Sequence, residues 1–317
     1  MKYYLLVVLA LSISISYFMP KSIAQGQNEE LKGRVSISGA WALYPMAVKW
    51  AEEFQKINPG IKIDISAGGA GKGITDALSK SVDLGMVSRE INPQEIQKGI
   101  WVVSVAKDAV VATFNADNPV IKEILAKGIT KEMFQKIFIS GEIKTWGQVV
   151  NSDNKDAINV YTRSDACGAA DTWAKYLGKK QEDLTGIGVY GDPGVAEAVK
   201  KDKFAIGFNN INFAYDAKVK TPVTGISVVP IDINNDRLID KSENVYQDIT
   251  AMTNAISQGK YPSPPARELY FVSNGVPQRK EVRAFLRWVL TEGQKFVPDT
   301  GFIKVPQERI NEDLQKL

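Results

Sequence analysis

Three short segments of small residues could hold an anion, because each follows an apolar, strand-like stretch and precedes a helical pattern. They are residues 38–41 (Ser-Gly-Ala-Trp), 67–73 (Ala-Gly-Gly-Ala-Gly-Lys-Gly) and 163–169 (Arg-Ser-Asp-Ala-Cys-Gly-Ala). A helix start leaves backbone N–H groups unpaired and carries partial positive charge, so small residues there let an anion approach closely. Two of these junctions also supply a cation, Lys72 and Arg163. The pattern therefore predicts a binding site for a small anion between helix ends.

The elements that must position these junctions alternate between strands and helices. Isoleucines at every second position of 61–65 indicate a strand, and the apolar residues of 43–54 follow the spacing of a buried helix face. Such alternation predicts parallel α/β units, whose binding sites lie at the carboxyl ends of the strands. Three further patterns predict one or two long strands, a helix and a closing helix, at residues 101–114, 131–138 and 281–296.

Residues 1–24 have the pattern of a secretory signal peptide. Lys2 precedes an apolar run at 5–15, and residues 22–24 (Ser-Ile-Ala) offer small side chains for cleavage. The run is short for a membrane span, which leaves an uncleaved N-terminal anchor as the alternative. Because Cys167 is the only cysteine, a lipid-modified N-terminal cysteine and an intrachain disulfide are both excluded. We expect a periplasmic or extracellular protein that is not a lipoprotein.

The composition excludes several classes of function. The 317 residues contain no histidine, which removes Ser-His and Cys-His catalysis and the commonest ligands of zinc and iron. A formal net charge of +3 gives no reason to expect nucleic acid as a partner. The chain after the signal is long for one hydrophobic core. We therefore predict two lobes, with residues 33–114 and 222–317 in lobe I, residues 115–221 in lobe II, and crossings near 115–119 and 216–222.

Several short motifs follow one another in a fixed order. They are Ser-Gly-x-x-x-Leu-Tyr-Pro at 38–45, Trp-Ala-Glu-Glu-Phe at 50–54, Asn-Pro-Gly at 58–60, the glycine-rich junction, Asp-Leu-Gly at 83–85 through Ser-Arg at 88–89, Ile-Phe at 137–138 with Trp146, Arg-Ser-Asp at 163–165, and Val-Arg-Ala-Phe-Leu at 282–286 through Gly301. In this order they resemble the phosphate-binding proteins that feed ABC phosphate importers. The resemblance covers almost the whole mature chain.

That resemblance implies an α/β periplasmic-binding-protein fold, in which two lobes joined by hinge-crossing segments close on a ligand cleft. It also implies a carrier, not an enzyme, that works as a monomer without a cofactor and delivers phosphate to the membrane permease of an ABC importer. The anion-binding positions that it implies are Ala40, Trp41, Ala70, Gly71, Lys72, Ser88, Arg89, Arg163, Cys167, Gly168 and Ala169. Asp165 is expected to orient Arg163 from behind.

This chain departs from the family at the hydroxyl groups. Serine and threonine are usual where it has Ala40, Trp41, Ala70, Lys72, Cys167 and Ala169, and Arg89 stands at a position that is acidic in some members. The departures leave open another oxyanion or a small anionic solute. A secreted hydrolase or phosphatase using Cys167 or a carboxylate-held metal, and an adhesion protein on the same fold, are alternatives from other classes. The lack of histidine argues against the hydrolase.

Residues 232–243 match the ligand spacing of a calcium-binding loop. Oxygen-bearing side chains stand at positions 1, 3, 5, 9 and 12, which are Asp232, Asn234, Asp236, Asp240 and Glu243. Position 6, where glycine normally makes the turn, is Arg237, and Pro230 argues against a preceding helix. The loop is therefore a candidate for Ca²⁺, with an ordinary acidic turn as the alternative.

Overall fold

The computed structural model describes residues 31–317, which form one compact unit. The predicted signal peptide at 1–24 lies outside the described residues. The strands are β1 (Gly33–Gly39), β2 (Ile61–Ala67), β3 (Leu84–Val87), β4 (Ile100–Asn115), β5 (Ile129–Thr130), β6 (Asn159–Arg163), β7 (Ile187–Val189), β8 (Ala205–Asn210), β9 (Ile226–Val228), β10 (Ile231–Asp232) and β11 (Ala266–Asn274). The helices are α1 (Tyr44–Ile57), α2 (Ala70–Leu78), α3 (Pro93–Gln97), α4 (Ile121–Lys127), α5 (Lys131–Phe138), α6 (Trp146–Val150), α7 (Gly168–Tyr176), α8 (Gly191–Lys201), α9 (Ile211–Ala214), α10 (Ile249–Ser257), α11 (Lys280–Leu290) and α12 (Gln307–Gln315).

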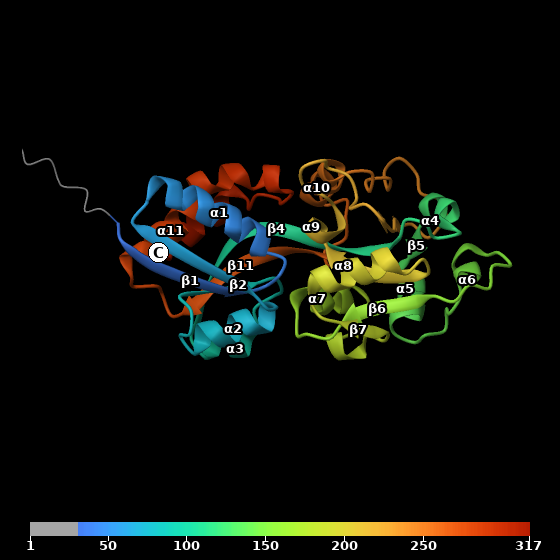
Figure 1. Ribbon diagram of the computed structural model, residues 1–317, viewed down its shortest axis with the longest axis horizontal. Coiled ribbons are helices and arrows are strands. Elements are labelled where there is room, and N and C mark those ends of the chain that lie inside the picture. Colours follow the sequence, from blue (N-terminus) through green and yellow to red (C-terminus); the bar gives the residue numbers. More distant parts are fainter. Residues whose placement is uncertain (1–30) are drawn as a thin grey trace, which may run out of the picture. The chain divides into compact units, whose positions relative to one another are not determined.

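A mixed sheet runs through this unit in the strand order β2-β1-β3-β11-β4-β8-β6-β7, with β9 also paired to β4. The outer strands are parallel, because β1 pairs with β2 and β3, and β6 pairs with β7 and β8, in the same direction. The central pair, β4 and β11, is antiparallel. Figure 1 shows α1, α2 and α11 around one end of the sheet, and α5, α7 and α8 around the other. The α/β architecture predicted from the sequence is confirmed.

Strand β4 is common to both ends of the sheet. Its first part pairs with β11 and its last part, from Val110 to Phe114, pairs with β8. The buried apolar side chains fall into two large cores, and β4 contributes Ala106 to the first and Ala109 to the second. Strand β11 divides in the same way, with Leu269 in the first core and Ala266 in the second. The two cores are therefore joined through two adjacent antiparallel strands.

The division between the cores differs in place from the lobe boundaries expected from the sequence. Residues 115–119 and 216–222 were expected as crossings, whereas the cores divide within β4 and β11. Side chains between Val228 and Ala266 pack in the second core, although residues 222–317 were assigned to lobe I. The reason is that β9 and β10 pair with β4 and β5, which holds this return segment against the second core. The exact lobe limits stay a prediction, since residues 31–317 form one unit.

The segments with the strongest periodic patterns form the predicted helices and strand. Helix α1 buries Met46, Ala47, Trp50, Ala51 and Phe54, and α5 has the bounds that the pattern gave. The long apolar run is a single strand, β4. The closing helix is shorter than expected: α11 ends at Leu290, and a 3₁₀ helix follows at Glu292–Phe296. None of the helices between residues 31 and 317 combines the length and apolarity that crossing a bilayer requires.

Candidate functional site

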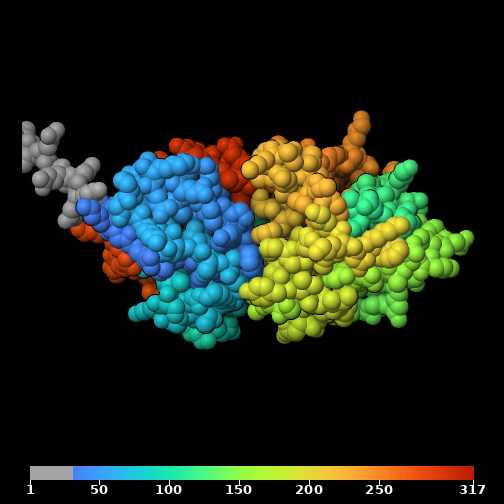
Figure 2. Space-filling model, in the orientation of Figure 1, coloured from blue at the N-terminus to red at the C-terminus, as the bar shows by residue number. Residues whose placement is uncertain are grey.

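The three junctions lie at the carboxyl ends of parallel strands. The first and second follow β1 and β2 beside the first core, and the third follows β6 beside the second core. They meet through the second junction, because the Gly68 N–H donates to the Gly39 carbonyl at 2.9 Å and the Gly71 N–H donates to the Ala166 carbonyl at 3.4 Å. Figure 2 shows the blue and yellow surfaces of these parts in contact along a narrow seam. The tertiary fold thus brings all three junctions to one place.

Gly168, the first residue of α7, packs closely against Ser88, which follows β3. A Cβ atom at this position would lie 2.2 Å from Ser88 Oγ and 2.3 Å from the Ser88 carbonyl oxygen. Any side chain here would therefore push the start of α7 away from the end of β3. The preceding residue, Cys167, caps α7 and accepts a hydrogen bond from the Ala170 N–H through its sulfur at 3.4 Å.

A small pocket lies where the junctions meet, and its walls are so close together that no water-sized space remains between them. Its walls are Trp41, Ala42, Gly69, Ala70, Ser88, Arg163, Cys167, Gly168, Ala169, Asp192 and Asn210. Sites for organic ligands usually measure about 300–1,000 Å³, so this closely packed site does not fit an organic ligand in the conformation described. Larger depressions lie beside β11 near Arg279 and near Lys175, and neither contains a junction glycine. We base the candidate site on the small pocket because it joins the three junctions.

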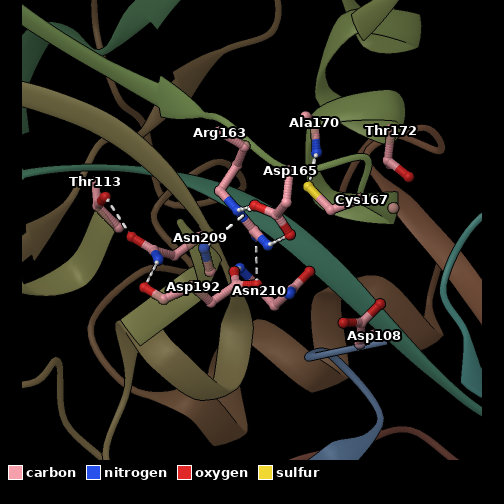
Figure 3. Close-up of polar contacts among 12 residues, drawn as sticks. Asp108, Thr113, Arg163, Asp165, Cys167, Ala170, Thr172, Asp192, Asn209 and Asn210 are labelled. Carbon is pink, nitrogen blue, oxygen red and sulfur yellow. Dashed lines mark hydrogen bonds and ion pairs between the residues drawn. The ribbon is translucent and has the colours of Figure 1, made fainter. Parts of the chain in front are cut away.

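Arg163 is the central charge of this pocket, and its side chain is fully buried. Its Nε donates to Asp165 Oδ1 at 2.8 Å and its Nη2 to Asp165 Oδ2 at 2.6 Å. On the other side, Nη1 donates to Asp192 Oδ2 at 2.6 Å. Figure 3 shows the guanidinium between the two carboxylates. An arginine has five N–H donors, so about two remain after these bonds for a further acceptor.

Asp192 is as firmly held as the arginine. It is 1% exposed, and its Oδ1 accepts the Asn210 N–H at 2.9 Å. Its carbonyl oxygen accepts from Asn209 Nδ2 at 3.0 Å. One guanidinium and two carboxylates give this cluster a formal charge of −1. A bound anion would therefore depend on short-range hydrogen bonds more than on net charge.

Burial and neighbouring charges set the protonation states in the pocket. Burial acts to lower the pKa of Arg163, but the charge of Asp192 and the bond to Asp165 outweigh it and raise the pKa above its ordinary value. Burial raises the pKa of the Cys167 thiol to about 12. The arginine is therefore always charged, and the cysteine stays a neutral thiol at physiological pH.

The structure brings most of the expected anion-binding residues together. Seven of them line the pocket, namely Trp41, Ala70, Ser88, Arg163, Cys167, Gly168 and Ala169, and Asp165 holds Arg163 from behind as expected. Ala40 lies in the first core, where its N–H donates to the Met86 carbonyl at 2.9 Å. Gly71 contacts the third junction through its N–H and does not line the pocket. Whether this set binds an anion stays a prediction.

Lys72 and Arg89, two cations among the expected anion-binding residues, point away from the pocket. Lys72 pairs with Asp76 one turn along α2, and its side chain is 43% exposed. Arg89 Nη2 pairs with Glu95 Oε1 at 2.6 Å, and the Arg89 guanidinium also donates to the Glu90 carbonyl. Neither residue lines the pocket. Local acidic partners at short sequence separation explain both placements.

Removing either of these charges is expected to leave anion affinity nearly unchanged. In Lys72→Met and Arg89→Met the lost charge is already neutralised by a carboxylate, and solvent screens what remains. The phosphate dissociation constant, measured by isothermal titration calorimetry, should stay within about threefold of the wild type, as a difference of about 1.4 kcal/mol would be tenfold. A tenfold loss in either variant would place that side chain at the ligand.

The sequence analysis missed four residues of the pocket wall, of which Asp192 and Asn210 are polar. Asp192 stands in the first turn of α8, where an acidic side chain interacts favourably with the helix dipole. This local role could have been predicted from the sequence. Its pairing with Arg163 spans 29 residues and depends on how β6 and β8 lie side by side. Asn210 ends β8, and its side-chain oxygen accepts from Arg267.

Arg267 stabilises the third junction through hydrogen bonds to the start of α7. Its Nε donates to Asp108 Oδ1 at 2.9 Å, and its Nη1 donates to Thr172 Oγ1 at 2.9 Å and to the Gly168 carbonyl. Asp108 is fully buried, and Arg267 is 7% exposed. Burial raises the pKa of Asp108, although the charge of Arg267 opposes the shift. This pair lies in β4 and β11, where the two cores divide, and it holds α7 to them.

Comparison with known proteins agrees with this architecture. The model of a PBP superfamily domain matches residues 25–292. The phosphate-binding protein PstS of Bacillus subtilis is 27% identical over 294 residues, covering 92% of this chain and 86% of that protein. PstS of Staphylococcus haemolyticus is 24% identical, covering 91% and 86%. These relatives confirm the resemblance to phosphate-binding proteins of ABC importers that the motifs indicated.

Solved structures show the same two-lobed fold. A phosphate ABC transporter substrate-binding protein of Clostridium perfringens, solved with bound phosphate, matches with a TM-score of 0.71 and 25% identity, covering 86% of this chain and 100% of that chain. An ABC-type phosphate transport receptor of Vibrio cholerae matches with a TM-score of 0.61 and 18% identity, covering 86% and 100%. The family model spans most of the sequence, and the chain therefore belongs to the PBP superfamily.

Proposed function

We propose that this chain is a solute-binding protein that captures phosphate for an ABC importer. The observation that carries the proposal is the buried Arg163, which stands in a small, closely packed pocket at the meeting point of three helix-start junctions. The names of the Bacillus and Staphylococcus relatives, and the phosphate bound to the Clostridium protein, support the same ligand. The permease of the importer is then the protein partner.

The pocket offers donors that do not depend on the family's usual hydroxyl groups. The first N–H groups of α7 have no partner within their helix, and Gly168 and Ala169 carry them into the pocket wall. Trp41 lines the same wall, and its buried indole Nε1 makes no hydrogen bond. Together with Ser88 and the remaining N–H groups of Arg163, these donors suit a tetrahedral oxyanion.

Asp192 supports phosphate over a fully deprotonated oxyanion. Its buried carboxylate lines the pocket, where it would repel an anion without protons but accept a hydrogen bond from one that carries a proton. Hydrogen phosphate keeps such a proton at neutral pH and sulfate does not. Some family members have an acidic residue at the position of Arg89. In this proposal, the Asp192 carboxylate takes over the role of that acidic residue from the other side of the pocket.

A carrier fits this site better than the hydrolase or phosphatase considered above. The chain has no histidine to act as a general base, and the buried Cys167 thiol, with its pKa raised to about 12, is a poor nucleophile. In the part of the chain that the structure describes, no three Asp, Glu, His or Cys side chains are grouped as metal ligands. We propose export to the periplasm or cell exterior from the pattern of residues 1–24, and action as a monomer remains an expectation.

Calorimetric titration of the purified protein with phosphate and with sulfate tests the proposal. We expect phosphate to bind with a stoichiometry of one and sulfate to bind at least about a hundredfold more weakly, because a buried carboxylate facing a proton-free oxyanion costs roughly 3 kcal/mol or more. In Asp192→Asn the preference should shrink about tenfold or more, since the amide no longer repels sulfate. No heat with phosphate, or equal affinities for both anions in the wild type, would contradict the proposal.

A further inference from the structure

The loop at residues 232–243, between β10 and α10, contains two buried carboxylate oxygens without a hydrogen-bond partner. They are Asp232 Oδ1 and Glu243 Oε2, in side chains of residues that are 1% and 6% exposed. A buried charged oxygen without a partner is costly, and native proteins pair such atoms with donors, water or a cation. These two residues occupy positions 1 and 12 of the calcium-loop pattern.

Both carboxylates accept hydrogen bonds from the backbone of the same loop through their other oxygens. The second oxygen of Asp232 accepts the Arg237 N–H at 3.0 Å. The second oxygen of Glu243 accepts the N–H groups of Ile233 at 2.8 Å and Asn234 at 3.3 Å. The first and last residues of the loop are therefore each tied to the backbone between them, which leaves one buried oxygen of each carboxylate without a partner.

Arg237 does not obstruct the loop as its sequence position suggested. Its φ angle is +63°, the left-handed conformation for which glycine is usual at position 6, so the turn is made without glycine. Its guanidinium leaves the loop: Nη1 donates to the Gly128 carbonyl at 2.8 Å and Nη2 to the Val149 carbonyl at 2.6 Å. Arg237 therefore makes the turn that glycine usually makes at this position, and its guanidinium lies outside the loop.

The remaining positions supply oxygen atoms of the kind that calcium prefers. Asn234 and Asp236 stand at positions 3 and 5, the Leu238 carbonyl at position 7, and Asp240 at position 9, where a water often intervenes. Fewer than three of the carboxylates converge as ligands in the described residues, but an amide, a main-chain carbonyl and water complete calcium sites of this type. Lys260 lines the depression beside Glu243 and is the competing source of positive charge.

We propose that residues 232–243 bind one Ca²⁺, with Asp232 Oδ1 and Glu243 Oε2 as the anchoring ligands. This site is independent of the phosphate pocket. Ca²⁺ would hold a loop that itself fastens α4, because Ile239 N–H donates to the Ala126 carbonyl at 2.8 Å and Arg237 binds Gly128. The ion is therefore expected to stabilise the second core, with the modest affinity of extracellular calcium modules, roughly 10⁻⁴–10⁻³ M.

The test is thermal unfolding of the metal-stripped protein in phosphate-free buffer, with and without 10 mM CaCl₂. At a hundredfold excess over the dissociation constant, the Tm should rise by about 4 °C for a chain of this length. The rise should be absent in Asp232→Asn and in Glu243→Gln, which keep the backbone hydrogen bonds but lose the charge. Equilibrium dialysis should find one calcium per wild-type chain and none in these variants.

Asp216→Asn is the matched control, because the Asp216 carboxylate also accepts backbone N–H groups within a turn, from Lys218 and Val219, but lies outside the loop. It should keep the full calcium-dependent rise. An equal rise with 10 mM MgCl₂ in every variant, or no rise in the wild type, would overturn the proposal. It would also be overturned if Lys260→Met lowered the Tm by several degrees in chelator and calcium did not restore it, because the lysine would then be the partner of Glu243.

Discussion

Replacing Arg163 with methionine is expected to cost most of the phosphate affinity and a large part of the stability. The variant removes the charged donors that face the pocket, each worth about 1.5–3 kcal/mol to an anion. We expect phosphate binding to weaken by about 2–4 kcal/mol, which is roughly 30- to 1,000-fold. The variant also leaves the carboxylates of Asp165 and Asp192 buried without their cationic partner, since these side chains are 8% and 1% exposed. This loss should lower the free energy of unfolding by about 3–5 kcal/mol.

Two further variants separate the role of the charge from that of the guanidinium shape. Arg163→Lys keeps the charge but cannot bond Asp165 through two parallel N–H groups, so its affinity should fall between those of the wild type and the methionine variant. Arg34→Met removes an exposed arginine that pairs with Asp64 and should leave affinity and stability nearly unchanged. Calorimetry and urea unfolding measure both effects. Wild-type phosphate affinity in Arg163→Met would remove this pocket as the anion site.

Replacing Arg267 with methionine is expected to give the other large effect, on stability. Asp108 is fully buried, and Arg267 is its ion-pair partner. Losing one member of a buried pair typically costs about 3–5 kcal/mol, and the Tm should fall on the order of 5–10 °C. The variant also frees the Gly168 carbonyl and Thr172, so the start of α7 loses its anchor.

The deficit of this variant should depend on pH. Burial already raises the pKa of Asp108, and removing Arg267 raises it further, since the arginine charge opposes the shift. Between the ordinary pKa of an aspartate and this raised value, the folded state binds a proton that the unfolded state does not, so stability falls as pH rises. The Tm difference from the wild type should therefore be larger at pH 8 than at pH 5. Equal Tm differences at pH 5 and pH 8 would show that Asp108 is not left as an unpaired buried charge in this variant.

A double variant provides the control for this explanation. In Asp108→Asn/Arg267→Met the carboxylate is absent, so the added pH dependence should vanish and part of the lost stability should return. An exposed pair, Lys201 with Glu197, offers a comparison: Lys201→Met should change the Tm by no more than about 2 °C at either pH. Failure of the double variant to recover any stability would point to lost packing of the arginine instead of charge.

Local patterns in the sequence were enough to predict several elements of the fold. Helix α1 and strand β4 follow from apolar spacing over a few turns or pleats, which short-range geometry fixes. The junctions were visible for the same reason, because small residues before a helix reveal its start. Lys72 was misjudged although Asp76 stands four residues later on the same helix face, which is the usual spacing of an ion pair. That local signal could have predicted its placement.

The class of fold, the helix-start junctions and the acidic loop can be predicted from the sequence, since each depends on residues close together in the chain. Which charges meet depends on the tertiary structure. Arg163 pairs with Asp192 across 29 residues, and Arg267 pairs with Asp108 across 159. Such pairs are set by strand order and register, which bring β6 beside β8 and β4 beside β11. A single sequence shows which side chains are charged. A buried charge needs a partner because burial without one is costly, but only the folded chain shows which residue that partner is.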